Sequence, residues 1–270
     1  MLFPDHLVII RGGGDLATGV AYRLHKAGFP VIVLELARPL VIRRRVALAT
    51  AVLEGHVTIE DLHGQLVHSP QEALSLAPTG TIPVLISPQL HNSQFTIHNS
   101  QFTVIDARLA KRNIDTHIHQ APLVIALGPG FTAGVDCHAI IETMRGHSLG
   151  RVIWQGPALP NTGTPGIIGG KGAERVLRAP ADGPVNWRLE IGDWVAEGEV
   201  IGEVAGLPVA APFAGVIRGL IAPGTAVTHS LKIGDVDARA DVDACFTISD
   251  KALAIGGGVL EAILVYLNQR

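Results

Sequence analysis

The sequence is poor in cysteine, in aromatic residues and in charged residues. Only two of its 270 residues are cysteines, too few for a disulfide framework, and this predicts a reducing, cytoplasmic environment. Hydrophobic residues make up 47% of the chain and charged residues 17%, so the composition is not that of a disordered protein. A net charge of −3 gives no reason to expect nucleic-acid binding, which needs a basic face.

Long apolar runs are also missing, and no secretory signal peptide is expected. The opening segment MLFPDHLVIIRGGG has no basic region followed by an apolar stretch and a cleavage signal. The longest apolar stretches are short, or are broken by a glycine triplet and by Glu261, so none is expected to span a membrane. Lysine is scarce as well, with five residues against 16 arginines, and this bias suits forked contacts to anions.

Short apolar segments alternate with helical patterns over residues 1–176. The apolar segments are bounded by Gly or Pro and lie at 7–10, 31–35, 82–86, 122–127 and 151–154. Segments that are apolar at every position are typical of parallel strands covered on both faces. Helices are expected between them, at 15–28, 39–55, 69–77 and 135–148. The pattern predicts a Rossmann-like α/β domain with a doubly wound parallel sheet.

A direct tandem repeat interrupts this alternation. HNSQFTI at 91–97 is followed at once by HNSQFTV at 98–104. A polar repeat that is used once has no packing logic of its own. Residues 91–104 are therefore predicted to form an exposed insertion in the loop after the segment 82–86, and no function is assigned to them.

A second repeat, with a period of 32 residues, lies in the segment 177–240, which is dense in glycine and proline. The repeated positions are Ala179 and Ala211, Pro180 and Pro212, Gly183 and Gly215, Val185 and Ile217, Gly192 and Gly224, and Val195 and Val227. Two such copies predict a small, two-fold symmetric all-β module. Residues 241–270 are predicted to return to the α/β domain, with a helix that begins near Gly258.

The repeated module is similar to the barrel-sandwich hybrid of biotinyl and lipoyl carriers. Those carriers present a modifiable lysine on the hairpin between the two halves. The corresponding residues here, 204–212, have the sequence VAGLPVAAP and contain no lysine. A swinging-arm carrier is therefore not expected, and a structural or docking role is preferred.

A glycine-rich turn directly follows the first apolar segment. It consists of Gly12, Gly13, Gly14 and Asp15. Glycines there, free to adopt positive φ, let a phosphate approach the helix N-terminus, and the acidic Glu35 about 20 positions on is placed to accept from a ribose hydroxyl. The Asp15 carboxylate would repel a phosphate unless it caps the helix or holds a cation. Nucleotide or dinucleotide binding is predicted here, with a purely structural turn as the alternative.

Two further glycine-rich segments are candidate cofactor contacts. They contain Gly128, Gly130 and Gly134, and Gly256, Gly257 and Gly258. The first follows a buried strand, where amides at the carboxyl edge of a sheet contact ligands, and the second could form a turn or cap with Ser249, Asp250 and Lys251. Cys137 is expected near a helix start, which would lower the pKa of its thiol and suit a nucleophile. A structural role is the alternative for Cys137 and is favoured for Cys245.

Metal and anion sites have weaker support elsewhere in the sequence. His117 and His119 would share one side of a strand, but no third ligand lies nearby, so no metal site is predicted. Arg43, Arg44 and Arg45 follow a proline on a predicted helix. A solvated helix face is the favoured interpretation of these arginines, and an anion clamp is the alternative.

Taken together, several motifs resemble the YqeB family, whose members are described as selenium-dependent molybdenum hydroxylase system proteins. The motifs are GGGDLATGVAYRL, GFPVIVLE, PLVIRR, APLVIALGPGFTAGVDCHAIIETMRGH, LGRVI, NTGTPG, KIGDVDAR and ISDKALAIGGGVLEAIL. AIGGGVLEA is also similar to the GGG-x-x-E element of the XdhC/CoxF maturation factors. The resemblance covers nearly all of the chain except the tandem repeat, and it puts residues 12–15, 35, 128–134 and 256–261 at the family's motif positions.

The resemblance implies an accessory or maturation factor for a molybdenum hydroxylase. Such a factor would bind a nucleotide or a molybdopterin-type cofactor, with NAD(P) and molybdopterin dinucleotide as the candidates. Its partners would be a molybdenum hydroxylase or other cofactor-maturation proteins, and a homo-oligomer is left open. The alternatives are an NAD(P)-dependent oxidoreductase, for which no acid/base pair is evident, and a docking scaffold with no small-molecule ligand.

Overall fold

The chain forms two compact units, which are described separately below. The computed structural model describes residues 1–90, 102–163, 166–167, 169–239 and 241–269. Unit 1 comprises Met1–Pro39, Ala47–Asn161 and Ile248–Arg270, and unit 2 comprises Leu40–Val46 and Thr162–Thr247. Unit 2 thus begins at 162, where the sequence suggested a boundary after 176, and it also takes a short segment from the N-terminal part of the chain.

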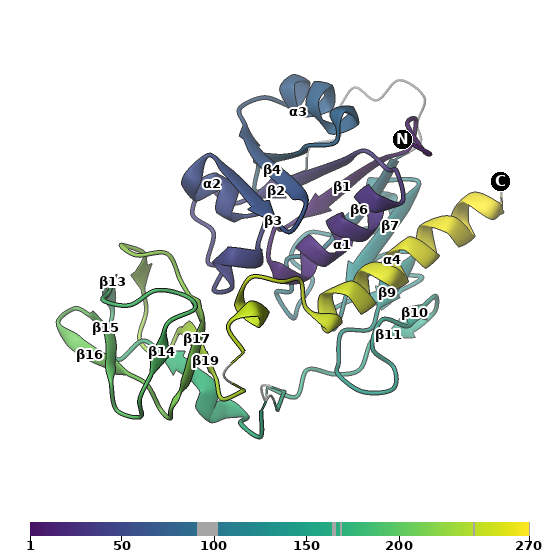
Figure 1. Ribbon diagram of the computed structural model, residues 1–270. Helices are drawn as coiled ribbons and strands as arrows, with labels where there is room; N and C mark the ends of the chain where they lie inside the picture. Colours follow the sequence, from purple (N-terminus) through teal and green to yellow (C-terminus); the bar gives the residue numbers. More distant parts are fainter. Residues whose placement is uncertain (91–101, 164–165, 168, 240, 270) are drawn as a thin grey trace. The chain divides into compact units, whose positions relative to one another are not determined.

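Unit 1 is built on a nine-stranded sheet with the strand order β10-β9-β7-β6-β1-β2-β5-β4-β3 (Figure 1). The seven strands between the two edge strands run parallel, whereas β3 and β10 pair antiparallel with their neighbours. The strands are β1 (Leu7–Arg11), β2 (Val31–Glu35), β3 (His56–Ile59), β4 (Leu62–Val67), β5 (Ile82–Ile86), β6 (Phe102–Asp106), β7 (Leu123–Leu127), β9 (Ala139–Ile141) and β10 (Val152–Ile153). Strands β8 (Thr132–Ala133) and β11 (Gly156–Pro157) form a separate antiparallel pair.

Helices cover both faces of this sheet. Helix α3 (Pro70–Leu76) packs on one face, where its Ala73 joins alternate side chains of β1, β2, β6 and β7 in a core. Helices α1 (Asp15–Lys26) and α4 (Asp250–Asn268) lie side by side on the other face (Figure 1). A short helix, α2 (Thr50–Glu54), precedes the β3–β4 hairpin.

The α1–α4 contact depends on glycine. A Cβ atom at Gly19 of α1 would lie 2.5 Å from the backbone of Ala252, and one at Gly256 of α4 would overlap the carbonyl oxygen of Gly19. A Cβ at Gly258 would overlap the carbonyl oxygen of Gly150 in the same way. The two helices can therefore approach this closely only because these positions have no side chain.

Several sequence-based predictions in unit 1 are wrong. Residues 102–104 of the tandem repeat are not in an exposed loop, because they form the start of β6, beside β1 at the centre of the sheet; the rest of the repeat, 91–101, lies outside the described residues. No helix forms at 135–148, where β9 lies instead. The helix expected at 39–55 is limited to α2 and a single 3₁₀ turn, η1 (Arg44–Val46). The last helix begins at Asp250, not near Gly258.

Unit 2 consists of two four-stranded antiparallel sheets, ordered β12-β19-β17-β14 and β16-β15-β13-β18. The strands are β12 (Val176–Arg178), β13 (Gly183–Trp187), β14 (Trp194–Val195), β15 (Val200–Val204), β16 (Leu207–Ala210), β17 (Gly215–Leu220), β18 (Ala226–Val227) and β19 (Lys232–Asp237). Val185 and Ile217, which are equivalent positions of the repeat, are both fully buried in one core.

The 32-residue repeat is visible in how the strands of unit 2 pair. The equivalent strands β13 and β17 begin at Gly183 and Gly215, and each pairs with the short strand of the other copy, β18 and β14 respectively. The two copies are therefore interlocked, and neither can complete its own sheet. Unit 2 thus consists of small antiparallel sheets in which the two copies of the repeat pair with each other.

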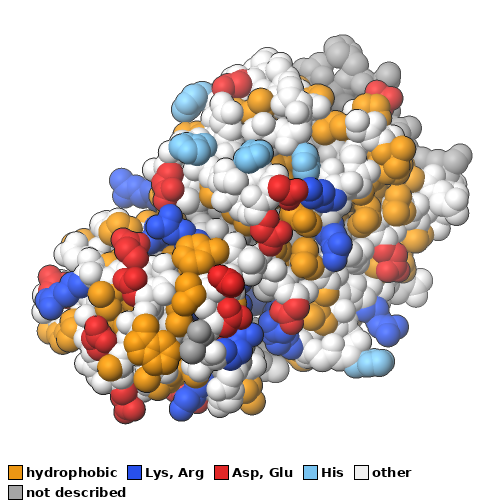
Figure 2. Space-filling model, viewed as in Figure 1, with side chains coloured by type: hydrophobic (Ala, Val, Ile, Leu, Met, Phe, Trp, Pro, Cys, Tyr) orange, Lys and Arg blue, Asp and Glu red, His pale blue; other side chains and the backbone are white. Residues whose placement is uncertain are grey.

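The surface has no region dominated by one charge sign on the face shown in Figure 2, where acidic, basic and apolar side chains are interspersed. In the described part of the chain, no helix is both long and apolar enough to cross a membrane.

Candidate functional site

The parallel sheet of unit 1 changes its direction of growth between β1 and β6. The chain leaves β1 towards β2 on one side and leaves β6 towards β7 on the other, although β1 and β6 are hydrogen-bonded neighbours. In open α/β sheets, ligands bind outside the carboxyl ends of the strands at such a switch point. The loops after Arg11 and after Asp106 meet there, because a Cβ atom at Gly12 would lie 3.1 Å from the Cα atom of Arg108.

The first glycine turn is held closed by the protein itself. The amide of Gly13 donates to Glu35 Oε2 at 2.7 Å, and the amide of Leu36 donates to Glu35 Oε1 at 2.7 Å. The carbonyl oxygen of Gly13 accepts from the amide of Ala49 at 2.8 Å. Glu35, predicted to contact a ribose, thus fixes the turn through Oε2 and the chain after β2 through Oε1, and the close approach at Gly13 serves packing.

The predicted positive φ angles are present at only one of the two expected glycines. Gly12 has φ +93°, which favours glycine, whereas Gly14 has φ −67° and immediately precedes α1 as its N-cap residue. Asp15 is the first residue of α1, and its negative charge is stabilised there by the helix dipole.

A network of charged and hydroxyl side chains ties the loops after β1 and β6 together. Arg11 is 2% exposed and donates from Nη2 to both carboxylate oxygens of Asp115 at 2.8 Å. Arg108 donates to Asp106 Oδ2 at 2.5 Å and to Asp115 Oδ1 at 2.7 Å, and Thr116 donates to Asp106 Oδ2 at 2.6 Å. Burial raises the pKa of Asp115, but the hydrogen bonds and charges of the two arginines outweigh it and leave that pKa lowered.

Two partly buried lysines bring positive charge to this region. Burial lowers the pKa of Lys251, in the first turn of α4, and the nearby charges of Arg145 and Lys111 lower it further, against the opposing effect of Asp15 and Glu142. Burial also lowers the pKa of Lys111, in the loop after β6, against the charge of Glu142. Both ammonium groups are thus held where their charged form is disfavoured, and a negatively charged ligand would relieve this.

Glu142 follows β9 and is only 1% exposed. Its Oε1 accepts from the amide of Met144 at 2.7 Å, and its Oε2 accepts from the amide of Leu159 at 2.8 Å. The carboxylate therefore organises the chain after β9 and supplies negative charge near the two lysines.

The second glycine-rich segment lies beside this cluster. Gly130 has φ +108°, and a Cβ atom there would lie 2.6 Å from the amide nitrogen of Arg112, next to Lys111. A Cβ atom at Gly128 (φ +72°) would overlap the hydroxyl of Thr143, while Gly134 (φ +85°) faces open space. Of these three glycines, Gly130 is therefore the one at which the glycine-rich segment contacts the loop that contains Lys111.

Cys137 differs from its predicted environment. It does not lie at a helix start, because β9 follows it, and it is completely buried. Burial and the charges of Asp136 and Asp106 raise the pKa of its thiol to about 12, whereas a helix N-terminus would have lowered it. Cys245 is also buried as a free thiol with a raised pKa.

The third predicted glycine segment lies inside α4. Gly256 and Gly258 pack against α1 and Gly150, and Gly257 has no neighbouring atom within 4 Å of its Cβ position. Ser249 caps the helix by accepting from the amide of Ala252 at 3.2 Å. The expected cap is therefore present, but the glycines themselves form no turn.

Five residues of this site were not predicted from the sequence: Arg11, Asp106, Arg108, Lys111 and Glu142. Asp106 and Glu142 each come at or just after a strand end, which is the position where α/β sheets place functional groups. That signal was hidden because β6 was attributed to the tandem repeat and β9 to a helix. Among the described residues, no group of three or more His, Cys, Asp or Glu side chains could hold a metal ion.

Comparison with known proteins gives one clear relative. The chain is 48% identical to the uncharacterized protein YqeB of Escherichia coli K12 over 274 aligned positions, which cover all of this chain and 50% of that protein. The chain thus spans about half the length of this curated relative. No model of a known protein family matches the sequence.

Similarity to solved structures is distant. The ectoine utilization protein EutE (DoeB) from Ruegeria pomeroyi has 14% identity and a TM-score of 0.24, over 87% of this chain and 58% of that one. An aspartoacylase family protein from Mesorhizobium loti has 12% identity and a TM-score of 0.26, over 86% of this chain and 85% of that one. TM-scores this low do not establish a shared overall fold, and neither ligand nor reaction is carried over from these proteins.

Proposed function

We propose that this chain, a homologue of E. coli YqeB along its whole length, binds the phosphate groups of a nucleotide or molybdopterin-type cofactor through unit 1. We further propose that it acts as an accessory factor in the maturation of a molybdenum hydroxylase. The maturation role rests on the motifs that resemble the YqeB family. The binding role rests on the switch point of the sheet and on the charges gathered there.

The fold supports a ligand site at the carboxyl edge of the sheet. Parallel strands with helices on both faces and a switch between β1 and β6 correspond to a Rossmann-like, doubly wound domain. The N-terminus of α1 follows β1 directly, so its first amides and its dipole lie at this edge. A phosphate there would meet backbone donors as well as side-chain cations.

The desolvation of Lys111 and Lys251 carries the proposal. Both lysines are partly buried, and the charge of Lys111 also lowers the pKa of Lys251. Keeping both ammonium groups charged therefore costs free energy, which a bound anion would offset. Asp15 and Glu142 offset part of that charge, and Arg145 adds to it. A pyrophosphate, which nucleotides and molybdopterin dinucleotide share, carries the negative charge that would offset the two lysines.

Two observations make the proposed cofactor role preferable to the alternatives. Glu35, the residue that an NAD(P)-dependent oxidoreductase would use for the ribose, has both oxygens committed to the amides of Gly13 and Leu36. For a docking scaffold alone, desolvated lysines at the switch point would serve no purpose. Unit 2, which we take to be a barrel-sandwich hybrid, has no lysine on its β15–β16 hairpin, so it supplies no acylated arm.

The test is a calorimetric titration of the protein with NAD, NADP, ATP, CTP and molybdopterin dinucleotide. Lys111→Gln and Lys251→Gln should each weaken binding of the preferred ligand by about tenfold, the effect of losing a hydrogen bond to a charged group. Lys26→Gln is the matched control, because Lys26 is exposed and pairs with Asp61 at the surface. Because the pKa of each lysine is lowered, both lose their charge at a lower pH than an ordinary lysine does. As the pH is raised, binding should therefore begin to weaken earlier than it would with ordinary lysines.

The proposal fails if none of the five compounds binds, and the docking scaffold then takes its place. It fails equally if a ligand binds but both lysine variants retain the wild-type affinity. Selective binding of NAD or NADP, with no affinity for molybdopterin dinucleotide, would favour the oxidoreductase.

A further inference from the structure

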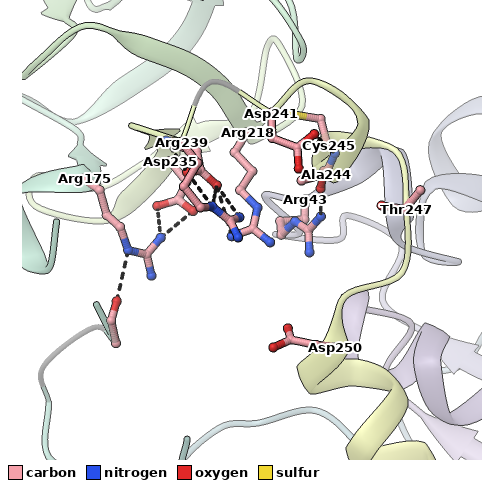
Figure 3. A network of polar contacts seen from close by, with 12 residues as sticks. Arg43, Arg175, Arg218, Asp235, Arg239, Asp241, Ala244, Cys245, Thr247 and Asp250 are labelled. Carbon is pink, nitrogen blue, oxygen red and sulfur yellow. Dashed lines mark hydrogen bonds and ion pairs between the residues drawn. The ribbon is translucent and has the colours of Figure 1, made fainter. Parts of the chain in front are cut away.

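Unit 2 buries an unusual number of charged side chains along β19 and its neighbours (Figure 3). Asp235 and Asp237 on β19 are 3% and 2% exposed, and Arg218 on β17 is 6% exposed. Burying charges costs free energy unless each is paired and hydrogen-bonded. The way these charges are paired is therefore informative.

Asp237 is fully engaged by one arginine and shared with another. Its oxygens accept from the amide, Nε and Nη2 of Arg239, at distances of 2.6 to 3.2 Å. Arg218 approaches Asp237 less closely, with Nη1 lying 3.6 Å from Oδ2. The carboxylate is thus saturated mainly by Arg239 and gives Arg218 only a long ion pair.

Asp235 forms its ion pair with a different arginine. Arg175, from the 3₁₀ turn η5 (Ala173–Arg175), forms an ion pair with Asp235, and Lys232 Nζ lies 3.8 Å from the same carboxylate. Arg43, which belongs to the segment of unit 2 between residues 40 and 46, donates from Nη2 to the carbonyl oxygen of Ala244 at 2.8 Å.

Arg218 is left with a buried donor that nothing satisfies. Within the described residues, its Nε has no hydrogen-bond partner although it is shielded from solvent. Burial lowers the pKa of Arg218, and the charge of Arg43 lowers it further, against the charges of Asp237 and Asp235. An orphaned guanidinium donor of this kind costs free energy that a ligand could recover.

Further cations lie around Arg218. They include Arg43, Arg175 and Arg239, and the acidic residues close to them include Asp235, Asp237 and Asp241. Figure 3 shows the guanidinium groups of Arg175, Arg218 and Arg43 following one another along one side of the network.

We propose that this cluster in unit 2 is a binding site for an oxyanion, such as a phosphoryl group, with the buried Nε of Arg218 as its central donor. Arginine forks match the oxygen spacing of phosphate and bind it in bidentate fashion. An oxyanion would satisfy the orphaned donor of Arg218 and would be attracted by the surrounding guanidinium groups. The site shares no residue with the lysine cluster of unit 1, so it is independent of the function proposed above.

Inorganic phosphate is the probe, titrated calorimetrically into the whole protein in HEPES buffer at constant ionic strength, with chloride as the reference salt. Arg218→Lys keeps the charge opposite Asp237 but removes the fork, and it should weaken phosphate binding by about tenfold or more. The side chain of Arg239 is partly exposed, and Arg239→Gln should weaken phosphate binding as well. Arg188→Gln, on the same unit but exposed and paired with Glu203, is the matched control and should bind as the wild type does.

A double variant, Lys111→Gln with Lys251→Gln, separates the two sites. Phosphate binding to unit 2 should persist in this variant, whatever happens to nucleotide binding in unit 1. The proposal is overturned if the wild type does not bind phosphate, or if Arg218→Lys and Arg239→Gln bind it with unchanged affinity while remaining folded by circular dichroism. Loss of phosphate binding in the double lysine variant alone would assign the anion to unit 1 and would equally overturn it.

Discussion

Burial decides the chemistry of individual residues in this protein more strongly than local sequence does. Cys137 follows a glycine-rich turn, and from the sequence a helix N-terminus would have made its thiol acidic. Cys137 is instead completely buried, with the charges of Asp136 and Asp106 nearby, so ionisation of its thiol is strongly disfavoured. Lys251 shows the converse, because partial burial makes an ordinary surface residue type a candidate ligand-binding group.

Cys137 should be almost inert towards thiol reagents in the folded protein. With a pKa of about 12, only about one thiol in ten thousand is ionised at pH 8, roughly a thousandfold less than for a free cysteine. The rate of labelling by iodoacetamide, followed by mass spectrometry with and without urea, measures this. Rapid modification of Cys137 under native conditions would show that the thiol is accessible and would reopen a nucleophilic role.

At the scale of secondary-structure elements, the fully apolar parallel strands were predicted correctly from the sequence, whereas β6, β9 and several helix boundaries were not. Strands β1, β2, β5 and β7 were found because apolar residues fill every position, and the period of 32 revealed the paired strands of unit 2. β6 was missed because its first three residues also belong to a polar repeat. The segment 135–148 has helical apolar spacing, but pairing of β9 with β7 and β10 overrides that local preference.

The candidate site was predictable only in part, for the same reason. The glycine turn after β1 was recognisable from its spacing, since it lies next to a well-defined strand. The contribution of Lys111 depends on which loops meet at the switch point, and that follows from the order of strands in the sheet. Pairing between segments nearly 100 residues apart, as in β1 and β6, leaves no local pattern.

The contact between α1 and α4 gives a prediction with an internal control. Gly256→Ala should lower the free energy of unfolding by about 1–3 kcal/mol, because the added methyl group would overlap the backbone of Gly19. Gly257→Ala, one position along the same helix, meets no atom and should raise it by about 0.5–1 kcal/mol through better helix propensity. Urea unfolding of both variants measures the difference. Equal effects at the two positions would mean that the helices do not pack through this face.

On the scale of the whole molecule, each unit has its own hydrophobic core and its own buried ion pairs. In unit 2, burial raises the pKa of Asp237, but hydrogen bonds from Arg239 and the charges of Arg239 and Arg218 outweigh it and leave the pKa lowered. A carboxylate with a lowered folded-state pKa stabilises the fold fully above its unfolded value, near 3.9. This contribution is lost as the pH falls through the folded-state value.

Asp237→Asn should therefore destabilise unit 2 at pH 7 by about 3–5 kcal/mol, because it removes the negative charge that the buried Arg218 and the partly exposed Arg239 both face. The difference from the wild type should shrink below pH 4, where Asp237 itself becomes protonated. Pulsed labelling of Cys245 in urea reports the unfolding of unit 2, and Cys137 reports unit 1 as the control. A loss of stability that stayed constant from pH 7 to pH 3 would contradict this account.

The pairing of α1 with α4 also has a consequence for the order in which the protein can be made. The ribosome releases α1 first, but the helix that covers its glycine face follows only after residues 27–249 have been added. At about 5–20 residues per second, that delay is roughly 10–45 s. During translation the first helix therefore has an uncovered face, which a chaperone could shield. The part of the sheet that α4 covers, at β7, β9 and β10, also stays uncovered until α4 has been synthesised.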